Sequence, residues 1–342
     1  MLAAMPTMRS PRTVLAALLA ALVLVGVAGL ADCATGSDPP HRAAGPGRAA
    51  TAGATAGLSG LRAGLARRAG GPAYYLSLGD SLSRGIQPAP SGQDAPTSHG
   101  YPNLLAARLR GVIGRLRLVQ LGCSGETTST MIHGGICRYP AGSQLAQATR
   151  FLRAHRSQVA LITIDIGAND PNSCVLGQPR AAIIGCLYKR VGQLQANLGA
   201  ILGQLRSAAG SRVLIVGMTY YVPELGLWHA GRTGKEVAAV TYDFAAGANK
   251  LLAAKYRRYG ARVADVFGAF RSADFAAAKR AEPAGPGSGR DRRGRTAAPP
   301  VNVTVVCSLT WMCARPPRGP NEHANDAGYR VIADAFWRAI TH

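Results

Sequence analysis

The chain of 342 residues carries a formal net charge of +22 at pH 7, from 39 lysines and arginines against 17 aspartates and glutamates. Such a basic excess is compatible with nucleic-acid binding, but the basic residues are scattered and no nucleic-acid-binding motif occurs. We therefore exclude nucleic acid as the partner. We expect a solvated basic surface that is loosely attracted to anionic envelope polymers or lipid headgroups.

The N-terminal segment has the features of an export signal. Arg9 and Arg12 precede an apolar run over Val14–Ala31, which is the order of the charged and hydrophobic regions of a signal peptide. We expect residues 1–31 to be a signal peptide and the protein to be secreted. The apolar run is close to the length of a membrane helix, so an anchor on the outer face of the cell membrane is the alternative, as is a lipoprotein modified at Cys33.

Residues 32–70 are predicted to be a disordered linker. They are rich in Ala, Gly, Thr and Pro, and they carry too few large apolar side chains to offset the entropy lost on ordering. The remaining residues, 71–342, are predicted to form one domain. Within it, Ala278–Pro300 is rich in Gly, Pro and Arg, which predicts a mobile basic loop.

The domain alternates between apolar runs and helical patterns. Five strands are predicted at Tyr74–Leu78, Leu116–Leu121, Val159–Asp165, Val213–Gly217 and Arg262–Val266. Helices are predicted at Tyr101–Arg110, Ser143–His155, Ala181–Ala208, Lys235–Tyr259 and Asp326–Ile340, the last with Asn325 as its N-cap. This alternation predicts an α/β fold of three layers, with a central, mostly parallel five-stranded sheet.

Three polar or small residues follow the ends of three predicted strands. Ser81, Gly125 and Asn169 each come just after such an end, where parallel sheets bind their ligands. Ser81 also precedes a predicted helix, whose N-terminal N–H groups would suit a nucleophile that develops an oxyanion. The same position fits an ordinary N-cap.

Four segments together resemble the GDSL (SGNH) hydrolases, whose blocks carry Ser, Gly, Asn and His in chain order. They are Gly79-Asp-Ser-Leu82, Leu121-Gly-Cys-Ser-Gly-Glu-Thr127, Ile166-Gly-Ala-Asn-Asp170 and His323-Ala-Asn-Asp-Ala-Gly-Tyr329. The resemblance covers the chain from Pro72 to its end and is closest to secreted lipases and esterases from high-GC actinobacteria. The chain departs from the family pattern in three places. The leading Asn of the Gly block is absent, Ala324 replaces the usual Pro, and Pro320 replaces the usual Asp.

The resemblance implies a monomeric esterase or lipase that needs no cofactor and no metal and acts on a small-molecule or lipid ester. Ser81 would attack the ester carbonyl, and His323 would take its proton. The backbone N–H groups of Ser81 and Gly125 and the side-chain amide of Asn169 would form the oxyanion hole. A carbohydrate O-acetyl esterase is one alternative. A catalytically weak protein that binds acyl or glycan groups is another, which the altered flanks of His323 favour.

The residue that orients His323 is an open question, because Pro320 offers no carboxylate. We expect a Ser–His dyad in which a backbone carbonyl of residues 318–321 accepts the proton on Nδ1. Glu322 and Asp326 are the side-chain candidates. Asp170 is expected to be a structural cap.

Six cysteines follow Cys33 and form three local pairs. Six cysteines allow fifteen connectivities, and short loops in an exported chain favour pairing of neighbours. The predicted bridges are Cys123–Cys137, Cys174–Cys186 and Cys307–Cys313, and the resembling lipases also carry three. No Cys-x-x-Cys motif suggests a metal site.

Overall fold

The computed structural model describes residues 72–175, 180–276 and 298–342. The expected signal peptide and linker, and nearly all of the expected basic loop, lie outside the described residues. Within the described ranges, no helix is long and apolar enough to cross a membrane.

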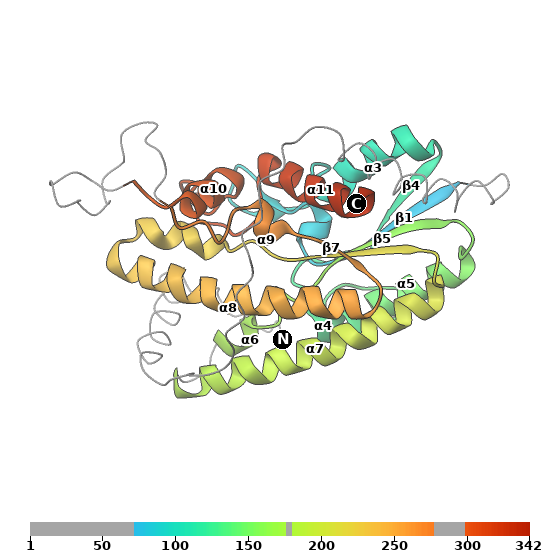
Figure 1. Cartoon of the computed structure of the whole chain (residues 1–342), viewed down its shortest axis with the longest axis horizontal. Coiled ribbons are helices and arrows are strands. Elements are labelled where there is room, and N and C mark those ends of the chain that lie inside the picture. Colours follow the sequence, from blue (N-terminus) through green and yellow to red (C-terminus); the bar gives the residue numbers. More distant parts are fainter. Residues whose placement is uncertain (1–71, 176–179, 277–297) are drawn as a thin grey trace, which may run out of the picture.

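A five-stranded sheet forms the centre of the molecule (Figure 1). Its strands are β1 (Ala73–Gly79), β4 (Leu116–Gln120), β5 (Val159–Asp165), β6 (Leu214–Met218) and β7 (Arg262–Ala264). They lie in the order β4-β1-β5-β6-β7, and every neighbouring pair is parallel. This confirms the predicted fold class, and the order places the ends of β1 and β5 side by side.

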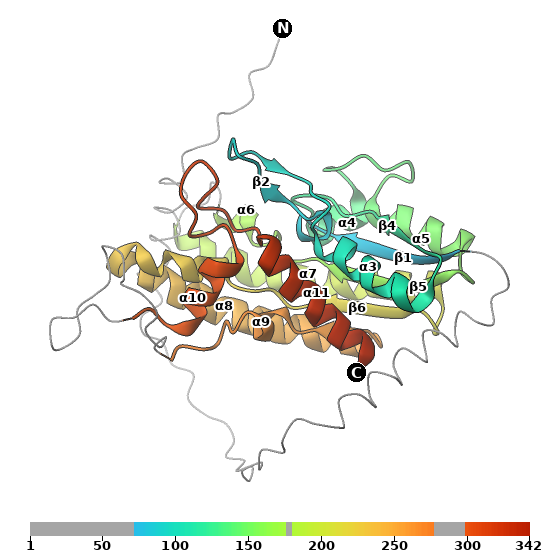
Figure 2. The same cartoon turned by 90° about the horizontal axis from the view of Figure 1, so that it is seen from above.

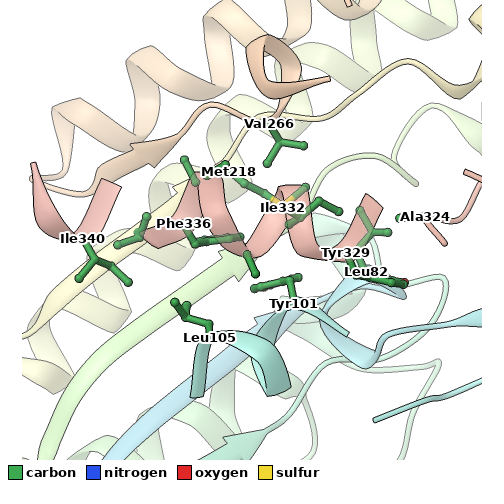
Figure 3. Close-up of a cluster of buried hydrophobic side chains, with 14 of the residues drawn as sticks. Leu82, Tyr101, Leu105, Met218, Val266, Ala324, Tyr329, Ile332, Phe336 and Ile340 are labelled. Atoms are coloured by element: carbon green, nitrogen blue, oxygen red, sulfur yellow. The ribbon is translucent and has the colours of Figure 1, made fainter. Parts of the chain in front are cut away.

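Helices cover both faces of the sheet, because alternate strand residues point to opposite faces. On one face, Tyr75 of β1 belongs to a core with α3 (Tyr101–Ile113) and α11 (Asp326–Thr341). Figure 3 shows this cluster, with Tyr101, Tyr329, Ile332 and Phe336 meeting between the two helices and the sheet.

On the other face, Leu76 and Leu78 of β1 belong to a second core. Its helices are α5 (Gln144–Ala154), α7 (Arg180–Ala209) and the C-terminal part of α8 (Gly231–Arg258). Figure 1 shows α5, α7 and α8 on the side of the sheet opposite to α3 and α11.

The predicted strands and long helices are present, with ends that differ by a few residues. β7 ends at Ala264 rather than Val266, because the Asp265 side chain accepts a hydrogen bond from the Gly268 N–H and so starts α9 (Val266–Ala269). Asn325 is the N-cap of α11, as predicted, and its side chain accepts from the Gly328 N–H.

Several short elements were not predicted. The helix expected after Ser81 is only the three-residue 3-10 helix η1 (Leu82–Arg84). The others are the hairpin of β2 (Gln87–Pro88) and β3 (Asp94–Ala95), α4 (Thr128–His133), α6 (Asn172–Val175), η2 (Pro223–His229) and α10 (Val301–Leu309).

Three disulfide bonds join the pairs of cysteines that are neighbours in sequence. Cys123 is bonded to Cys137, Cys174 to Cys186 and Cys307 to Cys313. The second bond joins α6 to α7, and the third links α10 to the loop that precedes α11. Each bond therefore ties a loop at the carboxyl edge of the sheet to an adjoining segment.

Candidate active site

A pocket of about 520 Å³ contains three of the four predicted site residues. Ser81 follows β1, Asn169 follows β5, and His323 lies in the loop ahead of α11; all three line this pocket. Gly125 is not among its lining residues. The parallel sheet explains the convergence, because neighbouring strands deliver their following loops to the same edge.

The backbone at Ser81 does not fit the simple N-cap interpretation. Ser81 has helical dihedral angles (φ −61°, ψ −31°), and its side chain makes no capping hydrogen bond to η1. An N-cap residue normally has extended angles and accepts from a helix N–H. The hydroxyl of Ser81 is therefore not committed to the backbone, and η1 is too short to contribute a large helix dipole.

Asn169 is fixed to the loop that carries Gly125. Its Nδ2 donates to the Glu126 carbonyl at 3.0 Å, which leaves a second N–H free on the same amide. Gly125 has φ +79°, and a Cβ there would meet nothing within 4 Å. The backbone angle, and not the close approach of a neighbour, is what requires glycine. The N–H groups of Ser81 and Gly125 donate to no partner within the described part of the chain.

Asp170 has a structural role. Its carboxylate accepts from the Thr128 N–H at 2.9 Å and from the Thr128 hydroxyl, at the start of α4. Burial raises the pKa of Asp170, and the bonds from Thr128 oppose that effect. The prediction that this residue acts as a cap is confirmed.

His323 is buried, with 6% of its surface exposed, and its Nδ1 lies 2.9 Å from the side-chain oxygen of Asn321. The Asn321 oxygen also accepts from the backbone N–H of His323 at 2.9 Å. The prediction of a main-chain carbonyl partner for Nδ1 is therefore wrong. With the proton on Nδ1, the neutral ring has its lone pair on Nε2, as a general base requires.

The two carboxylates proposed from the sequence do not hold the His323 ring. Asp326 bonds to Gln87 Nε2 at 2.7 Å and to His99 Nδ1 at 3.0 Å. Glu322 is exposed and bonds through its backbone carbonyl to the Tyr221 hydroxyl. A third carboxylate, Asp94 of β3, lies 3.5 Å from His323 Nδ1 through its Oδ2.

The pKa of His323 reflects these neighbours. Burial lowers the pKa, but the interaction with Asp94 and the negative charges of Glu322, Asp94 and Asp80 outweigh burial, so the pKa is raised. Asp94 shows the reciprocal effect, since its interaction with His323 lowers the pKa of the carboxyl group. No local signal in the sequence marks Asp94 or Asn321 as site residues.

Two buried carboxyl groups lie at the start of η1: Asp80 directly precedes Ser81, and Asp165 accepts from the Asp80 N–H at 3.3 Å. Asp80 and Asp165 are 1% and 0% exposed. Asp80 accepts from Leu82 N–H at 3.0 Å and from the Tyr220 hydroxyl at 2.9 Å. Asp165 accepts from Ser83 N–H at 3.1 Å and from the Tyr101 hydroxyl at 2.6 Å. Burial and the charge of Asp80 raise the pKa of Asp165 well above its usual range, so we expect the pair to hold a proton.

Much of the pocket wall is apolar, and many of its apolar side chains come from the two long helices. Leu187, Val191 and Leu194 of α7 face it, as do Val240, Phe244, Ala245, Ala248 and Leu252 of α8. The described residues contain no cluster of three or more His, Cys, Asp or Glu side chains arranged to hold a metal ion. The pocket therefore places an apolar surface beside Ser81, Asn169 and His323.

A family of known proteins matches most of the chain. Residues 77–331 match the model of the GDSL-like Lipase/Acylhydrolase family. No curated protein matches the chain. Solved structures that are similar include the lipase Lip_vut3 from a goat rumen metagenome, with 15% identity over 77% of this chain and 95% of that one and a TM-score of 0.45.

Two further similar structures belong to proteins with different substrates in their names. An extracellular lipase from Streptomyces rimosus has 21% identity over 70% of this chain and 100% of that one, with a TM-score of 0.42. The acetyl xylan esterase AlAXEase has 12% identity over 77% and 98% of the two chains, with a TM-score of 0.42.

Proposed function

Because the chain belongs to the GDSL-like lipase/acylhydrolase family, we propose that it is a secreted serine esterase or lipase in which Ser81 and His323 hydrolyse carboxylic esters. The observation that carries the proposal is that Ser81, Asn169 and His323 line one and the same pocket. Secretion is supported by the three disulfide bonds, which persist in oxidising compartments.

The reaction follows from the roles that these groups can perform. The Ser81 hydroxyl attacks the ester carbonyl while His323 Nε2 takes its proton, and the imidazolium then protonates the leaving alcohol. Water attacks the acyl-enzyme by the same route and releases the acid. The free N–H groups of Ser81 and Gly125 and the remaining N–H of Asn169 are the donors for the tetrahedral oxyanion.

The pocket wall supports an acyl chain longer than acetyl. The aliphatic and aromatic side chains of α7 and α8 would be desolvated by an alkyl chain, whereas an acetyl group would leave most of them in contact with water. This wall is the reason to favour an esterase or lipase over a carbohydrate O-acetyl esterase.

The nucleophile is tested with Ser81→Ala. We expect a loss of at least about 10⁴-fold in kcat on a p-nitrophenyl ester, with an unchanged unfolding temperature. An organophosphonate should label the wild-type protein at Ser81 alone. Labelling of another serine, or full activity in the variant, would refute the proposal. If the wild type shows no turnover but binds the ester, the protein is an acyl-binding member of the family.

The acyl preference is tested with p-nitrophenyl esters from acetate to palmitate. We expect kcat/KM to rise from acetate to chains of medium length, because each methylene that enters the pocket adds buried apolar surface. A maximum at acetate, together with release of acetate from acetylated polysaccharides, would instead identify an O-acetyl esterase.

A further inference from the structure

The short hairpin of β2 and β3 lies beside the segment between α10 and α11 (Figure 2). This segment carries His323, and the hairpin brings one carboxylate to the His323 ring. Asp94 Oδ1 accepts from Asn321 Nδ2 at 2.8 Å, and Asp94 Oδ2 lies 3.5 Å from His323 Nδ1. The carboxylate of Asp326 is instead hydrogen-bonded to Gln87 and His99. Among the described residues, Asp94 is thus the carboxylate that approaches the ring within ion-pair distance.

Asn321 is oriented without ambiguity by its neighbours. Its oxygen must face the backbone N–H of His323, because that group can only donate. The amide nitrogen therefore faces the Asp94 carboxylate, which can only accept when ionised. The same oxygen then accepts the proton on His323 Nδ1. A continuous path of hydrogen bonds runs from Asp94 through Asn321 to the imidazole.

The hairpin is held in place at two further points. Gln87 of β2 accepts from the Trp311 indole N–H at 3.1 Å and donates to Asp326 at 2.7 Å. At the turn, a Cβ on Gly92 would lie 2.3 Å from the Pro317 carbonyl oxygen, so the turn packs tightly against the His323 loop. The carboxylate of Asp94 is consequently presented by a supported element.

We propose that Asp94, acting through Asn321, is the acid that positions His323 and stabilises its imidazolium in this chain. The proposal rests on the proposed esterase function. In it, Asn321 holds the ring in the Nδ1–H tautomer, and Asp94 polarises the Asn321 amide and faces the charge that develops on the ring. The carboxylate missing at Pro320 is thus replaced by one from a distant part of the sequence.

The first test is Asp94→Asn, measured as kcat, KM and the pH dependence of kcat/KM. We expect kcat to fall by about 10–10²-fold with little change in KM. This is less than the ~10⁴ that follows when a directly bound triad acid is neutralised, because Asn321 still holds the tautomer. The acidic limb of kcat/KM should move to lower pH, since the ring loses one of the charges that raise its pKa. The charges of Asp80 and Glu322 remain in the variant.

Asp326→Asn is the matched control. It also converts a carboxylate that contacts the hairpin, but its partners are Gln87 and His99 rather than His323. We expect kcat/KM to stay within about threefold of the wild type and the acidic limb within about 0.3 pH units. The asparagine keeps the oxygen that accepts from Gln87 Nε2, so the support of the hairpin remains. Only the exposed ion pair with His99 is lost, and such a pair contributes little.

A double variant that exchanges the carboxylate of Asp94 and the amide of Asn321 tests whether Asp94 positions His323 or only supports the fold. In Asp94→Asn/Asn321→Asp, the new carboxylate accepts both N–H groups of His323, and the new amide at position 94 donates to it. We expect the double variant to recover at least tenfold in kcat over Asp94→Asn and to return the acidic limb towards the wild-type position. Asn321→Asp alone places two carboxylates side by side and should be less active than the exchange.

The outcomes distinguish the two proposals. If Ser81→Ala keeps its activity, the esterase proposal fails. If Ser81→Ala is inactive but Asp94→Asn retains wild-type kcat and pH dependence, only the role of Asp94 is refuted. A lower kcat in Asp94→Asn with an unmoved acidic limb and no recovery in the exchange variant would also refute it, because a structural defect explains that pattern.

Discussion

Among individual residues, Asn169 is the proposed oxyanion donor that can be removed by substitution, since the other two are backbone groups. Asn169→Ala should lower kcat by on the order of 10²–10³ with a smaller change in KM, the usual loss for one donor that acts mainly in the transition state. Steady-state kinetics on a soluble ester measure both values.

The substitution of Asn169 also has a structural effect that must be measured. Its amide also donates to the Glu126 carbonyl, so the substitution removes a contact between two loops as well as a donor. Thermal unfolding of the variant should therefore be measured beside the kinetics. A change confined to KM would place Asn169 in substrate binding and remove it from the oxyanion hole.

The buried pair of Asp80 and Asp165 predicts a pH-dependent stability. Burial and the charge of Asp80 raise the pKa of Asp165 in the folded state. We therefore expect the folded protein to bind a proton that the unfolded chain releases near the ordinary pKa of an aspartate. The stability of the wild type should fall as the pH rises above about 4, by at most about 1.4 kcal/mol per pH unit from this group.

Asp165→Asn should remove that slope. The amide is neutral at every pH, and its two polar atoms can still pair with Ser83 N–H and the Tyr101 hydroxyl, as Asp165 does. Urea unfolding at several pH values between 4.5 and 8 should show the variant gaining stability relative to the wild type as the pH rises. Parallel curves for the two proteins would mean that Asp165 does not hold a proton in the folded state.

At the scale of elements, the disulfide bonds stabilise loops that carry the site. Cys174 is fully buried, and its bond to Cys186 joins α6 to α7 just after Asn169. Cys174→Ser/Cys186→Ser should lower the free energy of unfolding by about 2–4 kcal/mol and should lower kcat by displacing the Asn169 loop. Urea unfolding and ester kinetics measure the two effects.

The bonds themselves can be checked by mass spectrometry. Reduction of the three bonds adds six hydrogens to the intact protein, and peptide mapping without reduction should return the three neighbouring pairs. Free thiols at Cys174 and Cys186 in the purified protein would show that the bond next to Asn169 does not form.

Elements with a local signal were predicted well from the sequence. The predicted strand Val159–Asp165 coincides with β5, whose seven residues are all buried and begin with the apolar run Val159–Ile162. The N-cap of α11 was found because Asn325 directly precedes an amphipathic run. Ser81, Asn169 and His323 were proposed from short motifs, and the structure brings them to one pocket.

The hairpin and its carboxylate had no such signal. Each strand has two residues, which is too short for an alternating pattern. Its position depends on contacts made by Gln87 and Gly92 with residues more than two hundred positions away. Asp94 was therefore missed, and the wrong partner was expected for His323, because non-local packing decides both.

For the whole molecule, the basic excess is the property that the active site does not explain. The net charge of +22 would fall only to about +20 if the expected signal peptide were removed, because residues 1–31 contain two charged residues, Arg9 and Arg12. A charge of this size creates a field that attracts anionic surfaces over about a Debye length, roughly 8 Å at physiological salt. Esters presented on such a surface should therefore reach the pocket faster than esters on a neutral one.

Vesicles test this expectation. We expect hydrolysis of a lipid ester in vesicles with 30 mol % phosphatidylglycerol, chosen as an anionic lipid, to exceed hydrolysis of the same ester in phosphatidylcholine vesicles at low salt. The advantage should shrink as NaCl rises from 20 to 500 mM, because salt screens the attraction between the basic protein and the anionic headgroups. Hydrolysis of a soluble, uncharged p-nitrophenyl ester over the same salt range is the control and should change little. Equal rates on the two vesicle types at low salt would show that the basic surface does not recruit the protein to its substrate.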